Sequence, residues 1–176
     1  KASADDVHLA VEAAHAAFAS YRSTTPGQRA TWLSKAADLL EQRKDAFADV
    51  LIDEIGSPLL KAHFEIKYAI AHLRTAAGIP RRITGQTLPS DVPGRFSMSV
   101  REPLGVFACI TPFNVPLIKA MKQCTGPLAT GNTVVMLCHL FKKLFSQRIG
   151  IRRVQPDPAI PRVFQPVFFQ SINMLC

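Results

Sequence analysis

The chain has 176 residues, of which 48% are hydrophobic and 19% charged, a composition typical of globular proteins that bury a sizeable core. No apolar run approaches the roughly 18 residues that cross a bilayer, and no signal peptide is recognisable, so we expect a cytoplasmic protein without a membrane partner. Most of the net charge of +8 comes from residues 138–176, which contain six basic residues and one acidic residue. Residues 1–137 are nearly balanced, with 15 basic and 12 acidic residues. This distribution argues against a nucleic-acid partner.

Four helices are predicted in the first 78 residues, because apolar side chains recur there at helical spacing between start and stop signals. Asp5 and Asp6 supply an N-cap and a first-turn acid, Pro26 suits a first helical turn, and Gly56 followed by Ser57 and Pro58 ends a helix. The helices are expected at about residues 5–20, from Pro26 through Leu40, through Ala46–Leu51, and from Pro58 to Ala77.

An antiparallel strand pair is predicted next. Residues Arg81–Pro89 and Arg95–Pro103 both contain β-forming residues, and the turn-rich stretch Pro89–Gly94 lies between them. We expect these two segments to pair with each other.

The segment after this pair has the pattern of a βαβ unit. Val106–Ile110 is a short apolar run, Val115–Leu128 has helical spacing, and Thr133–Leu137 is a second β-rich run. Such a unit implies a parallel sheet with a right-handed crossover, in which ligands bind beyond the carboxyl ends of the strands. The fold class is therefore α/β: an N-terminal helical group, an antiparallel strand pair and the start of a Rossmann-like parallel sheet. Residues Thr111–Asn114 lie where a ligand is expected.

Three blocks of this segment resemble the aldehyde dehydrogenase superfamily in their order and separation. They are REPLGV at Arg101–Val106, ITPFNVPL at Ile110–Leu117 and LATGNTVV at Leu128–Val135. Ser97–Val100 and Lys119–Lys122 are similar to members that act on benzaldehyde or vanillin. The resemblance runs from about Ala4 to Leu137, and it implies that residues 1–137 are the N-terminal part of a cofactor-binding domain whose segment 81–103 contributes to oligomerisation.

The resemblance implies a role for each residue of the β–α loop. The side-chain amide of Asn114 would help to form the oxyanion hole, since fixed amide donors stabilise negative charge that develops on the substrate oxygen. Spacing alone leaves an alternative in which Asn114 caps the helix that begins near Val115. Ile110, Thr111, Pro112 and Phe113 would line the nicotinamide and ribose side of NAD or NADP.

Other family features are not found in these 176 residues. Leu137 stands where the family has a lysine that holds the adenosine ribose or its phosphate, and the chain contains no G-x-G-x-x-G. Aldehyde oxidation in the family requires a nucleophilic thiolate and a glutamate that activates water, and both belong to later segments. Four cysteines are present, none of them in the family's nucleophile motif: Cys109, Cys124, Cys138 and Cys176. We expect them to be reduced structural thiols.

Residues 138–176 form a divergent basic tail. It contains four prolines and no helical or alternating periodicity, so we expect it to be poorly structured, and its origin in another reading frame or a terminal exon is a hypothesis. His8, Glu12 and His15 share a helix face with metal-ligand spacing, and His63, Glu65 and His72 are a second set of potential ligands on a later helix. Both sets are interpreted as exposed polar stripes, and no metal site is predicted.

Two functions remain open. In the first, the chain derives from an NAD(P)-dependent aldehyde dehydrogenase that converts an aldehyde to a carboxylate, and it is inactive by itself. In the second, it is a non-catalytic truncated protomer that forms a homo-oligomer or associates with full-length subunits through residues 81–103. A tail that binds RNA or an anionic membrane is a third, lesser alternative, which the salt dependence of binding would test.

Overall fold

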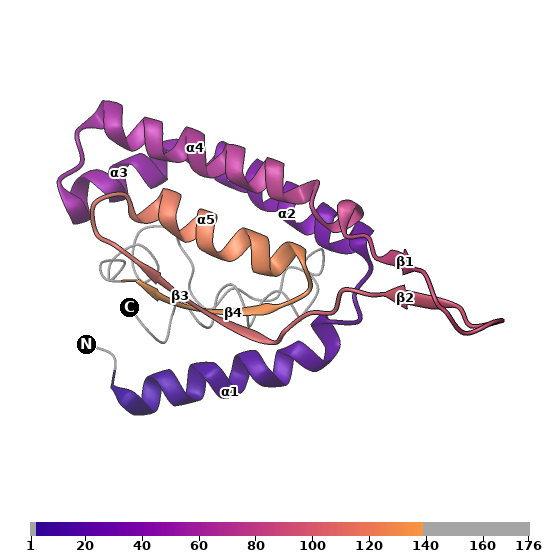
Figure 1. The fold of residues 1–176 in the computed structure, drawn as a ribbon. Helices are drawn as coiled ribbons and strands as arrows, with labels where there is room; N and C mark the ends of the chain where they lie inside the picture. The colour runs from indigo at the N-terminus through magenta and orange to yellow at the C-terminus, as the bar shows by residue number, and fades with distance from the viewer. Residues whose placement is uncertain (1–2, 139–176) are drawn as a thin grey trace.

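The computed structural model describes residues 3–138, and Figure 1 shows that they are arranged in layers. Helix α1 (Ala4–Tyr21) covers one face of a two-stranded parallel sheet, and helix α5 (Pro116–Ala129) covers the other. Helices α2 (Pro26–Gln42) and α4 (Leu59–Ala77) lie over α5, with α3 (Lys44–Ile55) at one end. The predicted α/β architecture is confirmed for this part of the chain.

The N-terminal helices begin and end where local chemistry favours it, with one correction at α1. Its N-cap is Ser3 rather than Asp5, whereas the predicted first-turn acid is confirmed in Asp6: the Asp6 N–H donates to the Ser3 hydroxyl at 3.2 Å, and the Ser3 N–H donates to the Asp6 carboxylate at 2.8 Å. This reciprocal pair of Ser3 with Asp6 satisfies two backbone donors at once. Gly56 ends α3 with φ +64, a conformation that glycine adopts without strain.

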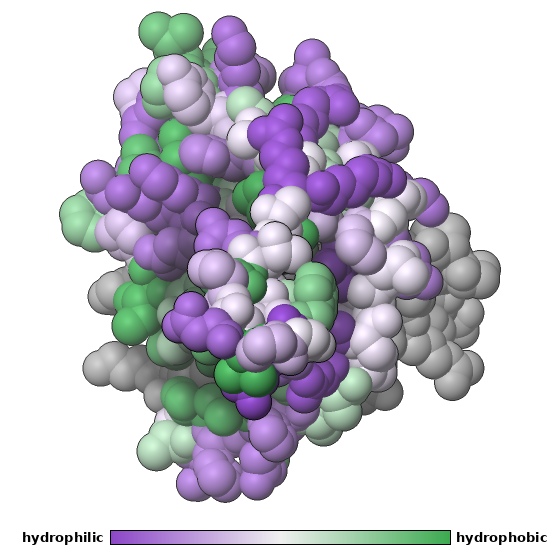
Figure 2. Space-filling view, turned by 45° about the vertical axis from the view of Figure 1, so that its right-hand side comes forward, coloured by the Kyte–Doolittle hydropathy of each residue, from purple (hydrophilic) through white to green (hydrophobic). Residues whose placement is uncertain are grey.

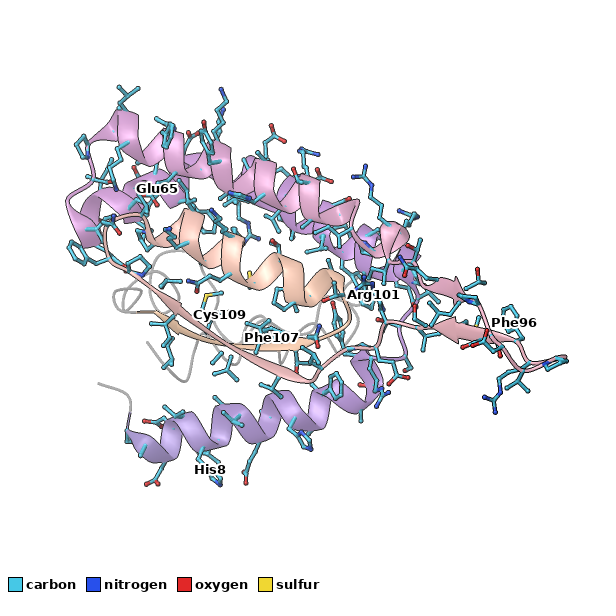
Figure 3. The ribbon with its side chains drawn as sticks, viewed as in Figure 1. His8, Glu65, Phe96, Arg101, Phe107 and Cys109 are labelled. Atoms are coloured by element: carbon cyan, nitrogen blue, oxygen red, sulfur yellow. The ribbon has the colours of Figure 1, made fainter. Side chains whose placement is uncertain are left out.

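Strands β3 (Val106–Thr111) and β4 (Thr133–Cys138) pair in parallel, with Val106 opposite Thr133 and Thr111 opposite Cys138. Their side chains alternate between the two faces. Phe107 and Cys109 lie toward α5, as Figure 3 shows, whereas Val135 packs against Ala10 and Ala14 of α1. The crossover through α5 confirms the predicted βαβ unit.

The main core lies where α2, α4 and α5 meet each other and one face of the sheet. Leu33, Leu73 and Leu128 are each almost completely buried there, and a buried leucine contributes about 1.5–3 kcal/mol to folding. Tyr21 crosses this core and donates its hydroxyl hydrogen to the Leu128 carbonyl at 2.8 Å. Burial raises the pKa of Tyr21 well above its usual value, so the phenol is held neutral.

Strands β1 (Gln86–Leu88) and β2 (Ser97–Ser99) form the predicted antiparallel pair, which projects from the body in Figure 1. Each strand has three residues, fewer than predicted. Pro80 begins a short 3₁₀ turn, η1 (Pro80–Arg82), and Pro89 lacks the N–H that would extend the ladder. Figure 2 turns this pair toward the viewer and shows hydrophobic residues among hydrophilic ones on this face.

Some expectations fall outside the described residues. The predictions for the basic tail concern residues 139–176 almost entirely and have no structural counterpart here. Within residues 3–138, no helix combines the length and apolar character needed to cross a membrane.

Candidate active site

The candidate site is the loop between β3 and α5, at the carboxyl end of β3. Only four residues, Pro112–Val115, join the end of the strand at Thr111 to the start of the helix at Pro116. Asn114 is exposed in this loop. The carboxyl end of a strand in a parallel α/β sheet is where ligands bind, so the structure brings Asn114 and its neighbours to the expected edge.

The four residues predicted to line a cofactor divide into two groups. Ile110 and Phe113 expose 66% and 65% of their surface, and Pro112 is also exposed. Thr111 is buried on the same face of β3 as Cys109, and its Oγ1 forms no hydrogen bond within the described part of the chain. The exposed group offers apolar surface beside Asn114, whereas the Thr111 side chain is turned into the protein.

The first turn of α5 is held by a residue from another helix. Glu65 of α4 is completely buried, and its Oε2 accepts a hydrogen bond from the Leu117 N–H at 3.2 Å. Its Oε1 lies 2.6 Å from Lys61 Nζ, which also donates to the Ser57 hydroxyl at 2.8 Å. The alternative in which Asn114 caps α5 is wrong: the N-cap is Val115, which has no capping oxygen, and Glu65 takes that role.

The adenosine side of a nicotinamide cofactor fits this chain less well than the nicotinamide side. The exposed apolar residues of the loop suit a flat ring, but Leu137 packs in the apolar cluster of Ala10, Ala14 and Val135 against α1. A leucine there supplies neither a hydrogen-bond donor nor a charge to a ribose or phosphate. At Leu137 the described residues therefore offer no polar contact to the adenosine end of such a cofactor.

No nucleophile is recognisable near the loop in the described part of the chain. Cys109 lies in the core beneath α5, and Cys124 lies on the buried face of α5. Cys176 lies outside the described residues, and the Cys138 side chain is not described. Among residues 3–138, no three His, Cys, Asp or Glu side chains are grouped closely enough to hold a metal ion.

Comparison with known protein families identifies the family of this chain. A family model described as "Aldehyde dehydrogenase family" matches residues 1–149 of the chain. The chain belongs to the aldehyde dehydrogenase family. The matched residues include the helices, the sheet and the Asn114 loop, and they extend beyond Leu137, where the resemblance in the sequence ends.

Individual relatives agree with this assignment. A vanillin dehydrogenase from Pseudomonas sp. (strain HR199 / DSM 7063) is 42% identical over 135 residues, which are 77% of this chain and 28% of the relative. A benzaldehyde dehydrogenase from Bacillus subtilis (strain 168) is 37% identical over 139 residues, 79% of this chain and 29% of that protein. The chain thus spans between a quarter and a third of the length of these aldehyde dehydrogenases.

Solved structures give the same result for the fold. A salicylaldehyde dehydrogenase from Pseudomonas putida G7, complexed with salicylaldehyde, superposes with a TM-score of 0.73 at 32% identity, over 77% of this chain and 28% of that one. An NAD-dependent benzaldehyde dehydrogenase from Corynebacterium glutamicum superposes with a TM-score of 0.73 at 35% identity, over 76% and 29%. The described part of the chain therefore has the fold of the corresponding segment in aldehyde dehydrogenases.

Glu65 is the site residue whose role the sequence did not reveal, and its interpretation as part of an exposed polar stripe is wrong because its side chain is completely buried. Its partner Leu117 is 52 residues away, and no local pattern links a glutamate in one helix to the first turn of another. The available signal was an acidic residue among the apolar positions of α4, next to Ile66 and one turn after Lys61. An acid at a buried helix position requires a partner, and that requirement alone could have marked it.

Proposed function

We propose that this chain takes part in the NAD(P)-dependent oxidation of an aldehyde to a carboxylate, with Asn114 as the residue that stabilises negative charge on the substrate oxygen. The observation that carries the proposal is the exposed asparagine at the carboxyl end of β3 in a member of the aldehyde dehydrogenase family. An exposed amide on a four-residue loop between two anchored elements has the fixed position that such catalysis requires.

The chemistry assigned to the chain's own residues is limited. The Asn114 side-chain amide donates a hydrogen bond to the aldehyde oxygen as that oxygen gains negative charge during nucleophilic attack. The exposed side chains of Ile110, Pro112 and Phe113 would exclude water from one side of the nicotinamide ring and orient it. A nicotinamide cofactor bound there would supply the hydride acceptor for the oxidation. Leu137 leaves the adenosine end without a contact of its own.

An aromatic aldehyde is the substrate class that we favour. The support comes from the relatives, which are named for vanillin, benzaldehyde and salicylaldehyde. The exposed ring of Phe113 beside Asn114 is compatible with contact to an aromatic substrate.

We expect these 176 residues by themselves to show no turnover. Neither of the described cysteines is accessible, and the segments that carry the nucleophile and the water-activating glutamate in the family are not recognised here. Incubating the purified chain with NAD or NADP and benzaldehyde, while following absorbance of the reduced cofactor, tests this. Measurable turnover would refute it.

A hybrid enzyme tests the role of Asn114 directly. Residues 3–138 would replace the matching stretch of the Pseudomonas vanillin dehydrogenase, which supplies the remaining segments. Asn114→Ala in this hybrid should lower kcat by about 10²–10³, the usual effect of removing one oxyanion donor, and should change KM little. Gln42→Ala, an exposed amide at the end of α2, is the control. A kcat equal to that of the control would rule out the proposed role.

Calorimetric titration of NAD and NADP tests whether the chain alone binds cofactor. A Leu137→Lys variant is titrated in parallel, because it restores a charged donor at the adenosine end. Binding that Leu137→Lys strengthens would support a formed nicotinamide side. Heat in neither titration would mean that the described residues are insufficient for binding.

A second candidate function is association with other aldehyde dehydrogenase subunits through β1 and β2. This candidate is favoured by the exposure of the strand pair, where Phe96 presents 72% of its surface and Met98 and Val100 more than half of theirs. Figure 3 shows Phe96 on the projecting pair, away from the body. Exposed apolar residues on an unpaired strand edge are typical of a surface that another chain covers.

Pull-down with a full-length relative, together with light scattering of the chain alone, tests this association. Phe96→Ser combined with Met98→Ser should weaken it at least fivefold. The control is Leu60→Ser, because Leu60 is equally apolar and highly exposed but lies on α4. A monodisperse monomer that captures no relative would eliminate this function.

A further inference from the structure

Glu65 is fixed in place by the two partners of its carboxylate. Oε1 is 2.6 Å from Lys61 Nζ and Oε2 accepts from the Leu117 N–H at 3.2 Å, while the side chain itself is completely buried. A buried carboxylate is costly unless charges and donors surround it, so both contacts are needed to keep it there. The Glu65 carboxylate is therefore a fixed point between α4 and α5. Figure 3 shows it at the end of α4 that lies near the start of α5.

Helix α5 has no cap of its own and depends on this carboxylate. Val115 at the N-cap position carries no side-chain oxygen, and Pro116 at the first helical position carries no N–H. The next donor is the Leu117 N–H, and it is the one that Glu65 binds. A negative charge at the N-terminus of a helix is also favoured by the helix dipole. Glu65 thus replaces, from 52 residues away, the local cap that α5 lacks.

The site loop is short enough for this anchor to control it. Its first end is held by the pairing of β3 with β4, where Thr111 lies opposite Cys138. Its second end is the first turn of α5, which Glu65 holds through Leu117, three residues after Asn114. With both ends fixed, four residues have little freedom to move. We propose that Glu65 is a positioning residue: it sets the start of α5 and thereby the place of the Asn114 amide, a role that rests on the proposed function of Asn114.

Stability alone is a poor explanation for the Lys61–Glu65 pair. Replacing a buried ion pair with apolar residues of similar size is often neutral or stabilising. An apolar pair at these positions would fill the same space but leave the Leu117 N–H without an acceptor. The two roles, packing and positioning, can therefore be separated by substitution.

Two double variants of the full chain make this separation. Lys61→Met with Glu65→Gln removes both charges but keeps a side-chain oxygen for Leu117. Lys61→Met with Glu65→Leu removes the charges and the oxygen together. Because the Lys61→Met change is common to both, they differ in the single acceptor at position 65. Arg74→Met with Glu41→Leu, which removes an exposed ion pair between α4 and α2, is the matched control.

Amide hydrogen exchange and ¹⁵N relaxation of the chain without ligand are the readouts. In the leucine variant, Leu117 should exchange about tenfold faster than in the glutamine variant, since a lost hydrogen bond is worth a factor of this size. The heteronuclear NOE of Asn114 should fall only in the leucine variant. Val134 and Val135 in β4 should exchange equally in both. Equal Leu117 exchange in the two variants, or a uniform rise at all amides, would overturn the proposal.

An NAD titration of the same variants tests whether Glu65 affects ligand binding at the Asn114 loop. Together with the hybrid enzyme, it distinguishes failure of the positioning role from failure of the proposed function. We expect the leucine variant to bind at least fivefold more weakly than the glutamine variant. If the unmodified chain binds no NAD, exchange at Leu117 and the NOE of Asn114 still decide whether Glu65 positions the loop, and the proposed function of Asn114 is decided separately by the kcat of the hybrid enzyme. Binding by both variants with equal affinity would overturn the positioning role with the proposed function left intact.

Discussion

The two ends of α5 are held in different ways. At the C-terminal end, each of the last four carbonyls, those of residues 126–129, accepts a hydrogen bond. Tyr21 donates to Leu128, the Arg29 Nε donates to Ala129 at 3.0 Å, and Thr130 and Asn132 donate to the remaining two. These donors come from α1, α2 and the turn before β4. This end is part of the scaffold.

The N-terminal end depends on one long-range carboxylate. Glu65 is negative where the helix dipole is positive, whereas the cationic Arg29 lies at the opposite end, so both charges have the favourable sign. The difference in the number of contacts has a consequence. The end with many bonds can lose one and keep its place, whereas the end beside Asn114 depends on a single anchor. Functional loops are commonly held in position by the rigid elements on either side of them, so loss of this one anchor should affect Asn114 directly.

The largest loss of stability is expected from a substitution at the C-terminal end of α5. Asn132→Ala should lower the free energy of unfolding by about 4 kcal/mol, because its side chain makes four hydrogen bonds of about 1 kcal/mol each. Its Oδ1 accepts from the N–H groups of Leu104 and Gly105, and its Nδ2 donates to the Pro127 carbonyl and the Thr130 hydroxyl. Urea denaturation measures the change. Asn114→Ala, at an exposed asparagine, should stay within about 0.5 kcal/mol.

Lys61→Met tests the N-terminal end of α5. It should lower the free energy of unfolding by about 3 kcal/mol, because it leaves the buried Glu65 carboxylate without its cation. The figure lies at the lower end for such pairs because the Lys61 side chain is 36% exposed. Urea denaturation of this variant and of the Lys61→Met, Glu65→Gln double variant gives the comparison. Restored stability in the double variant is expected, and a single-variant loss below about 1 kcal/mol would contradict the role assigned to the ion pair.

Tyr21→Phe removes one of the several hydrogen bonds at the C-terminal end of α5, and it should lower the free energy of unfolding by about 1 kcal/mol. It should also change the dependence of stability on pH. Because burial raises the pKa of Tyr21 above its usual 10.0, the folded state keeps a proton that the unfolded state loses above that pH. The stability of the unmodified chain should therefore fall as pH rises above 10, by up to about 1.4 kcal/mol per pH unit from this group.

The phenylalanine variant should lack this contribution, so the difference in stability between the two proteins should shrink as pH rises from about 9 to about 11. Thermal unfolding followed by circular dichroism at fixed ionic strength would measure it. A constant difference across this range would show that Tyr21 ionises in the folded state as readily as in the unfolded one.

The smallest effect is expected for an ion pair that holds neither end of α5. Glu41 of α2 lies 2.5 Å from Arg74 of α4, but both side chains are at least half exposed. Exposed pairs contribute little because water and salt screen them, so Glu41→Ala should change the free energy of unfolding by less than about 0.5 kcal/mol. A loss above about 1 kcal/mol would show that α2 and α4 depend on surface charge as well as on their apolar contact.

Much of the architecture was predictable because its signals are local. The capping residue Thr25 with Pro26, the glycine at 56 and the apolar spacing in Val115–Leu128 each act within a few residues, and the helices and the βαβ unit follow from them. The resemblance to aldehyde dehydrogenases was carried by three such short blocks. The placement of Asn114 at the end of β3 followed from parallel-sheet geometry in the same way.

What could not be predicted depends on contacts between distant parts of the chain. The Glu65 cap joins residues 52 apart, and the Tyr21 bond to Leu128 joins residues 107 apart. The error in the predicted lengths of β1 and β2 had a different cause. The prediction counted β-forming residues but not the missing N–H donor at Pro89. Ser3 rather than Asp5 is the N-cap of α1 because its hydroxyl can bond reciprocally with Asp6, a pairing that depends on the three-dimensional position of both side chains.

The docking of α1 on the sheet has a consequence for how the protein is made. Thr133 of β4 donates to the Ala14 carbonyl at 2.9 Å across 119 residues, so α1 cannot complete its contacts until β4 has been synthesised. At about 5–20 residues per second, the ribosome needs roughly 6–24 s to extend the chain over that distance. During this interval the apolar stripe of α1 is uncovered. Helix α1 thus leaves the ribosome well before it can complete its contacts with β4, and in that interval it is a ready substrate for a chaperone.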